Sequence, residues 1–126
     1  MKSLLNLSLL ASVALLAVHE MDAMTHAEWR LLPILNKLQD QTARDAFVLL
    51  HIPLYVGLFW ALFFASWKRV AARVLSGVMI VHAIAHFTLS GHELYTFAAP
   101  IETITVYGAA LFALCYLLLS LKMRPE

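Results

Sequence analysis

Four long apolar segments constrain this chain more than any other feature of its sequence. They cover about residues 3–24, 43–67, 70–92 and 100–121. A helix of about 20 residues crosses the ~30 Å hydrocarbon core of a bilayer, so each segment is long enough to span a membrane. The runs are continuous and lack the two-residue alternation of β-barrel strands. The sequence therefore predicts an all-α protein, a four-helix transmembrane bundle, in one domain over residues 1–126.

The composition agrees with lipid as the solvent. Hydrophobic residues make up 62% of the chain and charged residues 13%, whereas about one quarter of the residues in soluble proteins are charged. The formal net charge is +1, and the nine Lys and Arg residues lie between apolar runs without forming a patch. We therefore expect the lipid bilayer as the main partner and no nucleic-acid partner.

The first apolar segment could also serve as a secretory signal, because Lys2 precedes a leucine- and alanine-rich stretch that ends at Val18. A cleavage site needs small residues at its recognition positions, and His19, Glu20 and Met21 follow instead. We expect an uncleaved first span.

The basic residues predict the orientation of the bundle. Six of them would lie at the end that holds both termini: Lys2, Lys68, Arg69, Arg73, Lys122 and Arg124. The other three would lie at the opposite end: Arg30, Lys37 and Arg44. Because cytoplasmic loops carry the excess of Lys and Arg, we expect both termini in the cytoplasm, in a bacterial inner membrane.

The segment between the first two spans, residues 30–44, is too polar to cross a membrane. Four apolar residues in it follow the spacing i, i+3, i+4, i+7: Leu31, Ile34, Leu35 and Leu38. Pro33 suits the first turn of a helix. This pattern predicts a short interfacial helix on the outer surface.

The histidines are predicted to gather in the outer half of the bundle, because successive helices cross in opposite directions. All six map there: His19, His26, His51, His82, His86 and His92. Ionisable groups within a span are costly and are functional candidates by default. The plain alternative for any one of them is a hydrogen bond between helices, and for His92 an interfacial position.

A transition-metal site is the first hypothesis for this cluster. His82 and His86 share one helix face at i, i+4, and histidines from neighbouring helices with a carboxylate would complete a site for zinc or non-haem iron. The candidate ligands are His19, His51, His82 and His86, with Asp22 or Glu20 as a further ligand or as the acceptor that orients an imidazole.

Three further residues form a second tier of candidates: His26, Glu93 and Glu102. On a helical wheel His26 shares a face with His19 and Asp22, whereas Glu28 points to the opposite side of the helix from His19. Glu93 returns to the face of His82 if the helix continues through Gly91. The alternatives are a surface hinge around His26 and a first-turn acid at Glu102.

Two other functions remain open from the sequence. One is bis-histidine haem binding for electron transfer, because His51 and His86 are expected at similar depth. The other is a non-catalytic accessory subunit or transporter component, in a homo-oligomer or a larger membrane complex. Glu20 or Asp22 could act as a base, but no Gly-x-Ser-x-Gly nucleophile motif is present, so enzymatic activity is left undecided.

The same residues carry a family resemblance. The stretches 19–22 (His-Glu-Met-Asp) and 26–29 (His-Ala-Glu-Trp), then His51 with a proline after it, and the pair His82 and His86 resemble an uncharacterised bacterial family of small four-span membrane proteins, defined as a domain of unknown function. The likeness covers most of the chain. A fainter similarity is to a membrane family named for a His-x-x-Glu-Glu motif. These resemblances imply four spans and the same choice of residues, and no activity.

Overall fold

The computed structural model describes residues 2–122, which form four α-helices and two short 3₁₀ helices. In chain order these are α1 (Lys2–Thr25), η1 (Glu28–Arg30), η2 (Leu35–Lys37), α2 (Asp40–Phe63), α3 (Lys68–Leu89) and α4 (Pro100–Lys122). Each α-helix is long and apolar enough to cross a membrane. The predicted all-α, four-helix transmembrane bundle is thus confirmed as the fold.

Two helices end earlier than the apolar runs suggested. α2 spans Asp40–Phe63, so it begins before residue 43 and stops before residue 67. α3 stops at Leu89 and not at residue 92, because the Ser90 hydroxyl donates to the carbonyl of Phe87 at 2.7 Å and Gly91 follows. A hydroxyl that bonds the local backbone competes with the helical ladder. His92 and Glu93 therefore lie in the linker between α3 and α4.

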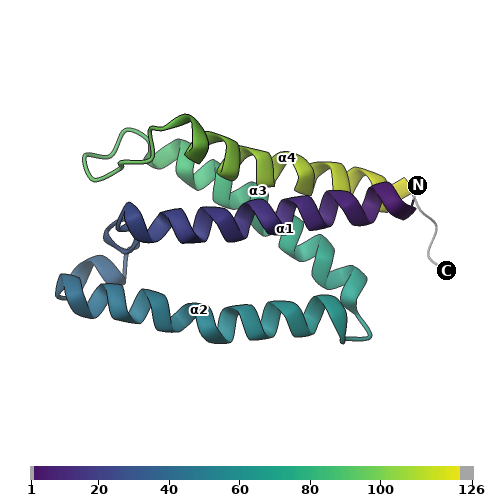
Figure 1. The fold of residues 1–126 in the computed structure, drawn as a ribbon, viewed down its shortest axis with the longest axis horizontal. Coiled ribbons are helices and arrows are strands. Elements are labelled where there is room, and N and C mark those ends of the chain that lie inside the picture. The colour runs from purple at the N-terminus through teal and green to yellow at the C-terminus, as the bar shows by residue number, and fades with distance from the viewer. Residues whose placement is uncertain (1, 123–126) are drawn as a thin grey trace.

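Helices α1, α3 and α4 pack against one another, and α1 and α4 run side by side (Figure 1). Small residues allow this close approach. The Ser12 hydroxyl donates to the backbone carbonyl of Ala109 at 2.7 Å, and a Cβ on Gly108 would meet a methyl group of Leu15 at 3.1 Å. Close packing of small residues is the usual means by which helices associate in lipid.

Helix α2 stands away from this three-helix core (Figure 1). It contacts η1 and η2 near its beginning and α3 near its end, and Ala43 and Phe47 are its only buried residues. The rest of α2 presents an apolar surface, as expected of a helix that faces lipid.

The connection between α1 and α2 contains two 3₁₀ helices where the sequence predicted one short interfacial helix. Leu35 is buried against Trp29 and Phe47, but Ile34 is 79% exposed, so the apolar residues do not share one face. Asp40 explains the shape. It accepts a hydrogen bond from the Trp29 indole at 3.0 Å and two from Arg30 at 2.7 and 2.9 Å, which draws the two ends of the segment together.

Candidate metal centre

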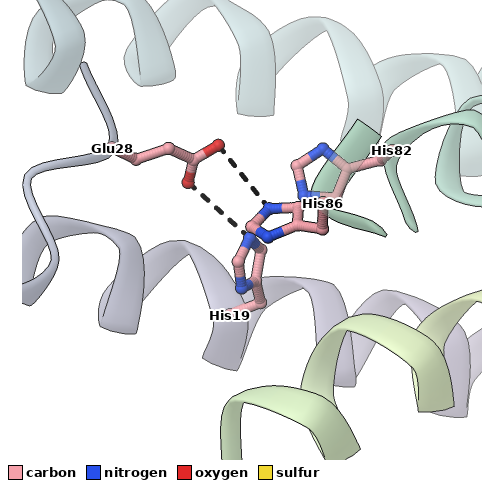
Figure 2. Close-up of side chains that lie close together, drawn as sticks. All are labelled: His19, Glu28, His82 and His86. Atoms are coloured by element: carbon pink, nitrogen blue, oxygen red, sulfur yellow. Dashed lines mark ion pairs between the residues drawn. The ribbon is translucent and has the colours of Figure 1, made fainter. Parts of the chain in front are cut away.

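Three histidines and one glutamate converge at the end of the bundle away from Lys2 and Lys122. They are His19 from α1, Glu28 from η1, and His82 and His86 from α3 (Figure 2). We call them the His/Glu cluster. Each residue offers one nitrogen or oxygen atom, and these four atoms all lie within 4.8 Å of one another.

The three imidazole rings surround one point. The ring centroids of His82 and His86, one helical turn apart, are 4.7 Å from each other. The centroid of His19 lies 5.0 Å from that of His82 and 4.7 Å from that of His86. The i, i+4 spacing of His82 and His86 therefore places both rings on one face of α3, as predicted, and both contact the ring of His19 on α1.

Glu28 closes the cluster from the connection that follows α1. Its Oε2 lies 3.7 Å from Nε2 of His19, and its Oε1 lies 3.9 Å from Nε2 of His86 (Figure 2). Both separations are too long for hydrogen bonds. Burial, together with the nearby carboxylate of Glu20, raises the pKa of Glu28 to about 7.

A left-handed turn at Ala27 brings Glu28 to this position. Ala27 has φ 50° and ψ 47°, a conformation that costs a non-glycine residue about 1–2 kcal/mol. α1 ends at Thr25, and the reversal at Ala27 buries both Glu28 and Trp29. The helical-wheel prediction that Glu28 points away from His19 was wrong, because the helix does not continue to residue 28.

The His/Glu cluster contains buried polar atoms without hydrogen-bond partners. His19 is 0% exposed. Neither of its ring nitrogens has a partner among the described residues, and the same holds for Oε2 of Glu28 and Nε2 of His82. A buried polar atom without a partner costs about 1–3 kcal/mol. A shared cation could bind one atom from each of the three residues, because a single imidazole offers only one of its two nitrogens to one ion.

The ligand types and spacing fit a first-row metal ion. Three imidazole nitrogens and one carboxylate oxygen suit zinc or iron. In a tetrahedral site with bonds near 2.0–2.1 Å, the ligand atoms are about 3.4 Å apart. The observed atoms lie within 4.8 Å, so small side-chain movements toward the common centre would complete such a site.

The linker between α3 and α4 supports the cluster from behind. The Tyr95 hydroxyl is 3.1 Å from Nδ1 of His86, which directs the other nitrogen of that ring toward Glu28. Phe97 packs against the rings of His19 and His86, at centroid distances of 5.7 and 4.9 Å. Burial, together with the neighbouring Tyr107 and carboxylates, raises the pKa of Tyr95 to about 12, so its hydroxyl keeps its proton.

His51 and Glu20, both predicted as metal ligands, lie outside the His/Glu cluster and contact each other. Nε2 of His51 is 2.8 Å from Oε2 of Glu20, and Nδ1 is 2.6 Å from the carbonyl oxygen of Phe47. Glu20 follows His19 directly on α1, so it faces α2 whereas His19 faces α3. The pair connects α2 to the three-helix core.

The other predicted residues fall into two groups. Asp22, His26 and Glu102 form a second cluster, in which Nε2 of His26 lies 2.6 Å from Oε1 of Glu102 and 3.7 Å from Oδ2 of Asp22. Glu93 and His92 are exposed in the α3–α4 linker and belong to neither cluster. Glu93 does not return to the face of His82, because α3 ends before Gly91.

Glu28 was not among the site residues predicted from the sequence. Alanine rarely adopts positive φ, so nothing in the local pattern marks the reversal at Ala27. The one available signal was the motif His-Ala-Glu-Trp at 26–29, which includes Glu28 in the family resemblance.

Comparisons with known proteins place the chain in a family without assigning a function. No curated protein and no solved structure matches it. The expected relationship to an uncharacterised domain-of-unknown-function family is confirmed, since one such family model matches residues 5–123. The chain belongs to the family of unknown function DUF6713.

Proposed function

We propose that this protein is an integral membrane metal-binding protein whose His/Glu cluster holds one divalent first-row transition-metal ion, zinc or iron(II). The observation that carries the proposal is His19. Its side chain is wholly buried, both ring nitrogens lack partners, and it lies among two more histidines and a carboxylate. Buried imidazoles that only joined helices would be expected to have hydrogen-bond partners.

Lipid strengthens this argument. In a bilayer no bulk water reaches a buried side chain, so an unpaired polar atom has few alternatives to a partner within the protein. Glu28 and His82 each also have a buried atom without a hydrogen-bond partner among the described residues. A bound cation would satisfy these atoms together and offset the cost of burying a carboxylate.

The choice between zinc and iron decides what the site can do. Four protein ligands complete a tetrahedral zinc site, and such an ion would fasten α1, α3 and η1 together. Iron(II) takes up to six ligands and would keep open positions for water or a substrate. A site that holds iron(II) could therefore be catalytic, whereas a site that holds zinc would be structural.

The geometry favours a bare ion over haem. Both nitrogens of His51 are engaged, one with the Phe47 carbonyl and one with Glu20. The rings of His19, His82 and His86 have centroids only 4.7–5.0 Å apart. Two axial histidines must stand on opposite faces of a porphyrin, and rings this close leave no room for one between them.

The test is the metal content of purified protein, extracted gently without chelator and then supplied with zinc or with iron(II). We expect one ion per chain in the native sequence and loss of that ion in His19→Gln. His92→Gln is the matched control, because His92 is exposed and outside both clusters. A native protein that retains neither metal would overturn the proposal, and equal loss in both variants would place the ion elsewhere.

A further inference from the structure

A second group of ligand atoms lies where α1 meets α4. It consists of Asp22 near the end of α1, His26 just after it, and Glu102 in the first turn of α4, and we call it the His26 cluster. One nitrogen and two carboxylate oxygens converge within 4.8 Å of one another.

The outer atoms of two of these side chains are fixed by the α3–α4 linker. Nδ1 of His26 is 2.8 Å from the hydroxyl oxygen of Thr96, and the backbone N–H of Ala99 donates to Oε2 of Glu102. These contacts leave Nε2 of His26 and Oε1 of Glu102 facing each other at 2.6 Å, with Oδ2 of Asp22 close to Nε2. Such support from behind is typical of the residues that bind metal ions in proteins.

Asp22 supplies the third atom, and that atom has no other role. Its Oδ2 is buried without a hydrogen-bond partner among the described residues. It lies 3.7 Å from Nε2 of His26, beyond hydrogen-bond reach. The cluster therefore has an acceptor that the His26–Glu102 contact does not satisfy.

Protonation of His26 alone would not balance the negative charge of the His26 cluster. The His26 cluster holds two carboxylates, and His26 is its only member that can become positive. An imidazolium would neutralise one carboxylate and leave the second. A divalent cation bound by both carboxylates and a neutral imidazole would match the charge fully.

The His26 cluster is accessible and separate from the His/Glu cluster. A hollow of about 260 Å³ adjoins it, and Asp22, Thr25 and Thr105 are among the residues that line it. The ring of Phe97 stands between the clusters, at centroid distances of 4.6 Å from His26 and 5.7 Å from His19. One ion cannot serve both sets of ligands across this apolar ring.

We propose that Asp22, His26 and Glu102 form a second divalent-cation site, independent of the proposed ion at the His/Glu cluster. Two carboxylates and one imidazole are a harder ligand set than three imidazoles and one carboxylate. The second site therefore takes an oxygen-preferring ion such as Mn²⁺, whereas the His/Glu cluster prefers zinc or iron. Such an ion takes more than three ligands, so water would complete its coordination.

The test is a titration of the full-length protein in detergent with Mn²⁺, in which electron paramagnetic resonance measures the bound ion. Zinc content is measured on the same samples as the readout of the His/Glu cluster. We expect Asp22→Asn to weaken Mn²⁺ binding at least about tenfold and to leave zinc content unchanged. Glu93→Gln is the control, because Glu93 is an exposed carboxylate on the same linker and outside both clusters.

Asp22→Asn is the main variant because Oδ2 of Asp22 has no hydrogen bond to lose, so the fold should tolerate the change. Glu102→Gln is the second variant and carries the risk of loosening α1 from α4. Native protein that binds no Mn²⁺, or an Asp22→Asn variant with native affinity, would overturn the second site and show that His26 and Glu102 form an ion pair only. Neither result bears on zinc at the His/Glu cluster.

Discussion

Glu28 belongs to the candidate metal centre because of the backbone conformation of one residue, Ala27. The left-handed turn at Ala27 redirects the chain just after α1, and a carboxylate enters a group of three histidines as a result. Unusual backbone conformations often mark functional positions, because the surrounding structure must maintain them.

The pH dependence of the metal-free protein should report on Glu28. Its pKa in the folded protein is about 7, above the value of 4.5 for a free glutamate, so the folded state binds the proton more tightly than the unfolded state. The Glu28 contribution therefore favours folding below pH 4.5 and is lost as pH rises through 7. With chelator present, we expect the Tm of the native protein to fall as pH rises through about 7, and the Tm of Glu28→Gln not to show this fall.

The comparison that matters is the difference in Tm between native protein and Glu28→Gln across pH 5 to 8, because other groups titrate in both. Metal should reverse the trend, since ionised Glu28 is the ligand and affinity should rise with pH up to about 7. Parallel Tm profiles for the two proteins in chelator would contradict the burial of Glu28.

Tyr95→Phe should weaken metal binding by about 10- to 100-fold and leave the fold intact. The variant removes the hydroxyl that lies 3.1 Å from Nδ1 of His86 but keeps the aromatic ring against Phe97. Loss of such a supporting contact typically has this magnitude. The measurement is a competition titration against a chelator of known affinity, and Tyr116→Phe, farther along α4 and close to Arg69 and Arg73, is the control. Equal affinities for Tyr95→Phe and the native protein would show that His86 does not depend on this contact.

At the scale of the elements, the main feature is the weak attachment of α2. It packs against η1, η2 and α3 near its ends, and Glu20 and His51 connect it to α1 along the way. The sequence suggested His51 as a metal ligand because it was expected in the outer half of the bundle, on a helix next to His82 and His86. Depth alone cannot show which neighbour a side chain faces, and His51 faces Glu20 of α1, outside the His/Glu cluster.

His51→Ala should therefore destabilise the protein without removing its metal. The change leaves Glu20 without its imidazole partner, at a cost of about 1–3 kcal/mol. We expect a lower Tm than in the control His92→Ala, with unchanged metal content in both variants. Loss of the ion in His51→Ala would instead support the ligand role that the sequence suggested.

The ends of a helix were predictable only where no side-chain hydrogen bond shortened or bent the apolar segment. α1 and α4 start and stop close to the ends of their apolar runs. α3 ended early through the Ser90 hydroxyl, and the connection before α2 bent because Asp40 binds both Trp29 and Arg30. These are specific hydrogen bonds between side chains and their surroundings, and a hydropathy pattern does not contain them.

At the scale of the whole molecule, length and hydropathy were enough to predict the bundle. Four apolar runs of about 20 residues leave little choice in lipid, because each must satisfy its own backbone as a helix. The gathering of His19, His82 and His86 at one end followed from the alternating directions of those helices. Their contact with Glu28, and the division of the polar residues into two clusters, depended on three-dimensional packing.

The distribution of basic residues predicts the orientation of this molecule in the membrane, and this prediction can be tested separately. Lys2, Lys68, Arg69 and Lys122 lie at the end opposite the two clusters, and we expect that end in the cytoplasm. A reporter active only in the cytoplasm should give signal when fused to the C-terminus. The same reporter inserted after Leu38 should be silent, and the reverse pattern would place both clusters on the cytoplasmic side.

X-ray absorption spectroscopy of the metal-loaded, full-length protein identifies the ligands around the ion and so tests the proposed metal centre itself. We expect three imidazole nitrogens and one carboxylate oxygen at about 2.0–2.2 Å for zinc. His19→Gln should lose this signature, since His19 is the buried histidine with both nitrogens unpaired. A spectrum of bound zinc without imidazole scattering, or one that is unchanged in His19→Gln, would contradict the assignment of His19, Glu28, His82 and His86 as the metal centre.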